Sequence, residues 1–178
     1  MSIPNVLRTV LFYGSRPVVW FLFGLMTWRA ERSQVGPFEV IVVSRAAGIR
    51  EHVVKLQSAA ELLREFDRSR YKRVTEAIRL IVIVDHDRAM VAEYHHSTKA
   101  ILLQAKALET LNVPGLGALL AHEATHARIM NLGIHHTASA SHRIERLCLR
   151  NEIWFLERVP SGRVLAEVKR QRLAADEV

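Results

Sequence analysis

The spacing of hydrophobic residues separates a strand-rich part of the chain from a helical part that follows it. Apolar residues recur every three or four positions in 51–66, which predicts a helix, and the charged residues 67–73 after it predict a solvated connection. Short runs rich in β-branched residues predict strands at 38–43, 79–84, 91–95 and 100–104. Helical spacing predicts later helices at 116–130, 143–159 and 161–175. The order predicts an α+β fold, in which a small antiparallel sheet precedes three helices.

Residues 1–35 form a hydrophobic segment flanked by arginines, and residues 36–178 are predicted to form the folded domain. The longest uncharged piece, 17–28, would span about 18 Å as a helix, which is too short to cross a membrane. No small-x-small cleavage site follows it, so a secretory signal is not indicated. Two interpretations stay open: a segment lying on a membrane surface, or helices packed on the domain's own core.

Composition narrows the class of protein further. The chain has 178 residues, 49% of them hydrophobic, which fits one folded domain and excludes a disordered chain. Its single cysteine, Cys148, excludes an internal disulfide framework and is interpreted as a small buried residue. The formal charge of +7 suits an anionic surface. No nucleic-acid motif accompanies that charge, so no nucleic-acid partner is expected. The expected location is cytoplasmic, either free or peripheral at the membrane through residues 1–35.

The motif that points to chemistry is His-Glu-x-x-His, formed by His122, Glu123 and His126 on the predicted helix 116–130. Residues four apart share a helix face, so both imidazoles can bind one zinc ion. A catalytic zinc site has three protein ligands and one open position. The third ligand must then come from later in the chain, after a helix stop at Gly133. Glu145 follows His126 after eighteen residues, and Glu152 lies on the same predicted helix face.

This arrangement, His-Glu-x-x-His followed after eighteen residues by a glutamate, resembles the gluzincin metallopeptidases. The resemblance implies a zincin-like domain in which His122, His126 and Glu145 bind Zn²⁺ and Glu123 is the general base. No aspartate follows Glu145 within one helical turn, where these enzymes usually carry a supporting carboxylate. Three histidines are candidates for stabilising the oxyanion: His135, His136 and His142.

The sequence therefore predicts a zinc-dependent hydrolase, most simply a metallopeptidase that acts on peptide or protein substrates. Water activated by zinc would attack the peptide bond, and Glu123 would carry its proton. An edge strand of the predicted sheet could pair with an extended peptide. The alternative is a structural or interaction protein at the membrane periphery, in which zinc is structural or absent.

Overall fold

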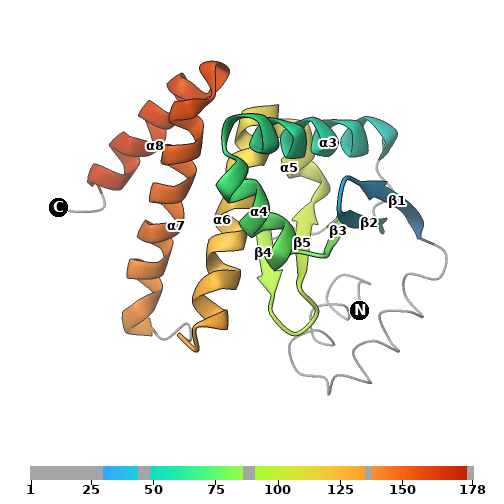
Figure 1. The fold of residues 1–178 in the computed structure, drawn as a ribbon, viewed down its shortest axis with the longest axis horizontal. Coiled ribbons are helices and arrows are strands. Elements are labelled where there is room, and N and C mark those ends of the chain that lie inside the picture. Colours follow the sequence, from blue (N-terminus) through green and yellow to red (C-terminus); the bar gives the residue numbers. More distant parts are fainter. Residues whose placement is uncertain (1–29, 44–48, 86–90, 135–137, 176–178) are drawn as a thin grey trace.

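The computed structural model describes residues 30–43, 49–85, 91–134 and 138–175 (Figure 1). The predicted α+β class is confirmed, since a five-stranded sheet is followed by helices. The strands are β1 (Glu31–Val35), β2 (Phe38–Val42), β3 (Leu80–Val84), β4 (Ala92–His95) and β5 (Ala100–Gln104). The helices are α3 (Ile49–Phe66), α4 (Arg68–Ala77), α5 (Ala105–Thr110), α6 (Val113–Asn131), α7 (Ala138–Arg158), the short 3-10 helix η1 (Pro160–Gly162) and α8 (Arg163–Ala175).

The sheet is mixed, so the expectation of an antiparallel sheet is wrong. Its strand order is β1-β2-β3-β5-β4, with the pairs β2–β3 and β3–β5 parallel and the two outer pairs antiparallel. The reason lies in the connection from β2 to β3: α3 and α4 carry the chain back, so β3 starts at the same end of the sheet as β2. At the other side, β4 forms an edge of the sheet and turns through residues 96–99 into β5.

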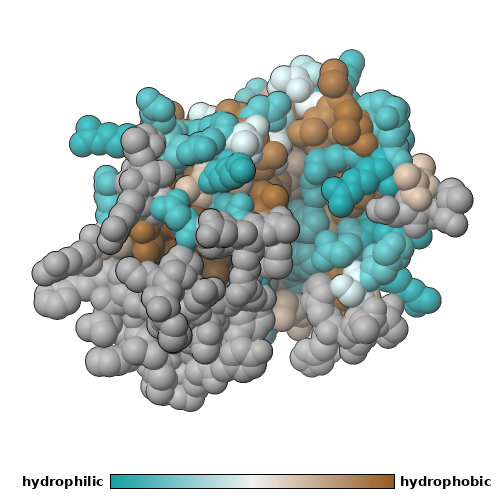
Figure 2. All heavy atoms as spheres, turned by 180° about the vertical axis from the view of Figure 1, so that it is seen from behind, coloured by the Kyte–Doolittle hydropathy of each residue, from teal (hydrophilic) through white to brown (hydrophobic). Residues whose placement is uncertain are grey.

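The hairpin of β1 and β2 brings residues 31–35 into the sheet, with Val35 opposite Phe38. Gly36 adopts a φ of +53° in the turn, a conformation that glycine takes without steric cost. Residues 1–29, which carry most of the predicted membrane-surface segment, lie outside the described residues. Within the described ranges, no helix is long and apolar enough to cross a membrane. Seen from behind, the described surface is mostly hydrophilic, with smaller hydrophobic areas between (Figure 2).

Helix α6 runs through the centre of the domain and contacts α3, α4, α7 and β4. One face of the sheet, which includes Val40 and Ile81, packs in a core with these helices. The opposite face, which includes Ile41 and Val82, forms a second buried cluster, as expected for successive residues of a strand. Both faces of the central strands are therefore apolar, which explains why these strands read as unbroken hydrophobic runs.

A glycine in α6 allows α7 to approach closely. A Cβ added at Gly117 would lie 2.8 Å from Cε1 of Phe155, a side chain of α7 that is fully buried. Ala118, Ala121 and Ala124 are also small and buried on α6. Short side chains let two helix axes come near each other, so functional groups on α6 and α7 can meet.

Residues 67–73, predicted as a solvated connection, instead form the cap and first turns of α4. Residues 68, 69, 72 and 73 are exposed as predicted, but Asp67 and Arg70 are buried. The Asp67 side chain caps the helix by accepting a hydrogen bond from the Arg70 amide at 3.0 Å. Asp67 and the Arg70 guanidinium also form an ion pair with side chains only 6% and 5% exposed. Arg70 donates to Asn151 of α7 and lies 4.7 Å from the ring centroid of Trp154. Charge alone did not predict this pair, because Asp67 and Arg70 neutralise each other inside the fold.

Replacing Asp67 by alanine is expected to lower the free energy of unfolding by about 3 kcal/mol, because the buried Arg70 charge would lose its partner and α4 its cap. Urea unfolding measures the change. The matched control is Glu76→Ala, which breaks an exposed pair with Lys72 and should change stability by less than about 0.5 kcal/mol. Equal effects of the two substitutions would contradict the role given to the buried pair.

Candidate metal centre

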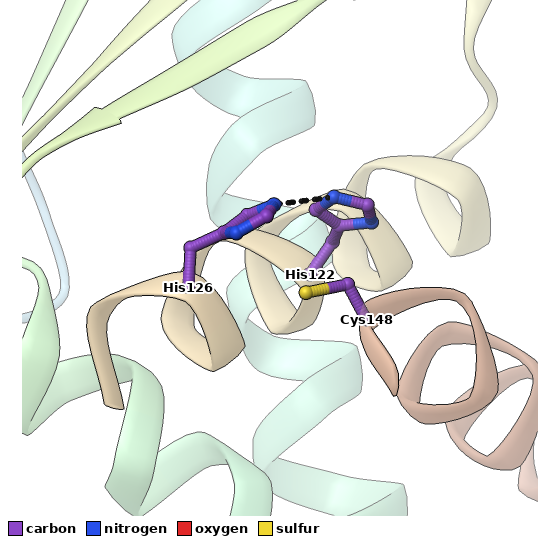
Figure 3. A group of neighbouring side chains, drawn as sticks. All are labelled: His122, His126 and Cys148. Carbon is purple, nitrogen blue, oxygen red and sulfur yellow. Dashed lines mark hydrogen bonds between the residues drawn. The ribbon is translucent and has the colours of Figure 1, made fainter. Parts of the chain in front are cut away.

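The two histidines of the motif lie one turn apart on α6, and one nitrogen of each ring points toward the other ring (Figure 3). The Nε2 atoms of His122 and His126 are 2.9 Å apart, and the ring centroids are 4.8 Å apart. The helix that carries them begins at the cap residue Asn112, whose side chain accepts a hydrogen bond from Gly115. It ends before Gly133, whose φ of +77° agrees with the predicted helix stop.

Glu145 on α7 faces both imidazoles. One carboxylate oxygen lies 3.4 Å from Nε2 of His122, and the other lies 3.4 Å from Nε2 of His126. Ligands bound to one zinc ion at about 2.0–2.2 Å in a tetrahedron stand about 3.3 Å apart. The three donor groups, separated by 2.9–3.4 Å, therefore fit a single ion of this size.

Glu152 lies on the opposite side of His122, against its other ring nitrogen. Its Oε1 is 2.5 Å from Nδ1 of His122, and its Oε2 is 2.5 Å from Nζ of Lys169 on α8. A carboxylate in this position orients the ring and keeps Nε2 turned toward the neighbouring donors. Glu152 is therefore placed to support the ligand His122. It takes the role for which the sequence offers no aspartate within one helical turn after Glu145.

These contacts shift the pKa values of the buried groups. Burial lowers the pKa of His122, but hydrogen bonds to Glu145 and Glu152 outweigh burial and raise it to about 10. Burial raises the pKa of Glu152, but the hydrogen bond to His122 and the charge of Lys169 outweigh it and hold the pKa below its usual value. In the absence of a metal, the negative carboxylates stabilise a proton on His122. A divalent cation would meet the same negative surroundings.

Glu123 lies beside the histidine pair and faces the edge of the sheet. Its side chain is buried, and it accepts a hydrogen bond from the backbone amide of Tyr94 in β4. Burial raises its pKa to about 7, against the opposing charge of His122. A carboxyl group with a pKa near neutrality can both accept and release a proton under physiological conditions.

Cys148 is a residue of this site that the sequence analysis did not assign to it. Its prediction as a buried residue is confirmed, with 0% of the side chain exposed. Its Sγ and one ring nitrogen each of His122 and His126 all lie within 4.8 Å of one another (Figure 3). The sequence did contain an indication that Cys148 lies at this site. It follows Glu145 by three residues, and this spacing places both side chains on one helix face.

Two further features concern a pocket and the histidines considered for the oxyanion. A pocket of about 300 Å³ opens on another face of α6, where Ala121, Thr125 and Arg128 line it together with residues of α4 and α7. None of the predicted site residues lines that pocket. Of the histidines considered for the oxyanion, His142 is exposed near the start of α7, and residues 135 and 136 lie outside the described ranges.

Comparison of the chain with protein-family models, with curated proteins and with solved structures finds no match. The chemistry of the motif and the geometry of the donors from α6 and α7 are therefore what indicate a function.

Proposed function

We propose that the chain is a zinc-dependent hydrolase, a metallopeptidase in which His122, His126 and Glu145 bind the ion. The observation that supports this proposal most directly is the convergence of three donor groups, 2.9–3.4 Å apart, from two helices. Two imidazoles and one carboxylate are a ligand set used by catalytic zinc sites. The supporting carboxylate on Nδ1 of His122 is a further feature of such sites.

A bound zinc ion supplies a Lewis acid that polarises the scissile carbonyl and lowers the pKa of the attacking water. Glu123 takes a proton from that water and passes it to the leaving amine, so the carboxylate is restored at the end of the cycle. Its buried position beside His122 and its pKa of about 7 support this role. Glu152 and Lys169 hold the His122 ring in place while the proton moves.

The edge strand β4 is the proposed binding surface for the substrate backbone. Within the described chain, β4 pairs on one side only, with β5. The Tyr94 amide of this strand donates to Glu123, so β4 lies directly beside the proposed general base. An extended peptide that adds to β4 through main-chain hydrogen bonds would pass near the histidine pair.

Metal analysis combined with a hydrolysis assay tests the proposal. The purified full-length protein should hold about one zinc per chain and cleave members of a pool of unstructured peptides. A chelator should abolish cleavage, and added Zn²⁺, but not Mg²⁺, should restore it, because the donor set includes two imidazoles. A zinc-loaded protein that cleaves no peptide would favour the structural alternative at the membrane periphery. A chain that binds no zinc would overturn the metal site itself.

A further inference from the structure

The α7 face that meets the histidines carries three functional groups in one stripe. Glu145, Cys148 and Glu152 are spaced by three and four residues, so they follow one another along the same side of the helix. Glu145 faces the Nε2 atoms of the histidine pair, and Glu152 contacts Nδ1 of His122. Cys148 lies between these two carboxylates in the stripe, and its Sγ is within 4.8 Å of one ring nitrogen of each histidine.

The surroundings of Cys148 hold its sulfur close to the proposed metal position. The side chain packs against Ile129 of α6 and Ile144 of α7 and is 0% exposed. A zinc–sulfur distance of about 2.3 Å implies a separation of about 3.6 Å between the sulfur and a coordinated ring nitrogen. The three donor atoms lie within 4.8 Å of one another without a metal, so coordination would draw the sulfur and the two rings closer together.

We propose that Cys148 is a ligand of the same metal ion, so that four protein groups bind it at rest: His122, His126, Glu145 and Cys148. On coordination, the thiol releases its proton to solvent, and the sulfur takes the position that a water molecule would occupy. The inference rests on the proposed metal site. It differs in that the fourth position around the ion, open to water in the three-ligand site, is filled by sulfur at rest. Hydrolysis then requires one donor to leave, and Glu145, whose side chain is 52% exposed, is the donor with room to move.

Cobalt substitution gives a direct test, because Zn²⁺ has a filled d shell whereas Co²⁺ reports its ligands by absorption. The full-length protein loaded with Co²⁺ alone should show the visible bands of a tetrahedral ion and a near-ultraviolet band from thiolate-to-cobalt charge transfer. Cys148 is the only cysteine of the chain, so that band has one source. Cys148→Ser should remove it, keep the visible bands, and weaken cobalt binding by more than about tenfold.

The possible outcomes separate this inference from the proposed function. Visible bands without the charge-transfer band in the wild-type protein would overturn the role of Cys148 and leave the three-ligand site standing. A wild-type protein that binds no Co²⁺ or Zn²⁺ would overturn both. If Cys148→Ser fails to fold, which circular dichroism shows, Cys148→Ala replaces it, and the wild-type spectrum by itself decides whether the thiolate is bound.

Discussion

Replacing Glu123 by glutamine is expected to reduce peptide hydrolysis by about 10²–10⁴-fold, the usual contribution of a general acid–base group. Glutamine keeps the length and shape of the side chain, and its amide oxygen can still accept the hydrogen bond from Tyr94. It cannot take a proton from water. The variant should retain the zinc content and the melting temperature of the wild type, because Glu123 is no ligand in the proposed site.

A matched control separates chemistry from a general effect of removing a carboxylate. Glu109 is exposed and lies on α5, a different helix from the one that carries the histidine pair. Glu109→Gln should therefore leave hydrolysis and metal content unchanged. Turnover by Glu123→Gln at the wild-type rate would remove this residue from the mechanism. A loss of zinc together with activity would instead indicate that Glu123 helps to hold the ion or its ligands.

Sequence spacing was sufficient for the features that depend on one helix. Residues four apart share a face, so the contact between His122 and His126 follows from the motif. The end of α6 before Gly133 was also predictable, because glycine tolerates the positive φ that closes a helix. Strands β2 to β5 were predicted near their observed positions because their hydrophobic runs are short and β-branched, whereas the polar strand β1 was not predicted.

Features that depend on contacts between distant segments were not predictable in the same way. The parallel pairing of β2 with β3 is decided by how α3 and α4 pack, and no local pattern records it. Arg70 looked like a surface charge because its partners include Asn151, far away in the sequence. Lys169 lies at the site because α8 packs against α7, which places its ammonium group beside Glu152.

The second large effect is expected for the carboxylates of α7, which the sequence left as alternative ligands. Glu145→Ala should weaken zinc binding by more than about 100-fold, because it removes a donor that faces both Nε2 atoms. Glu152→Gln should weaken it by about 10–100-fold, the range found for groups that orient a ligand. Its amide oxygen can still accept from Nδ1 of His122, although the charge that stabilises this contact is lost.

Competition of the purified protein with a chromophoric zinc chelator measures both variants on one scale, and urea unfolding shows whether each is folded. Glu157→Gln is the control, since Glu157 lies on α7 in an exposed pair with Arg170 and should bind zinc like the wild type. Glu152 has two ion-pair partners and little exposure, so its replacement should also cost more stability than that of half-exposed Glu145. Zinc affinity should therefore depend mainly on Glu145 and stability mainly on Glu152. If Glu152→Gln loses zinc while Glu145→Ala retains it, the third ligand lies two turns further along α7, and the comparison with gluzincins fails at this position.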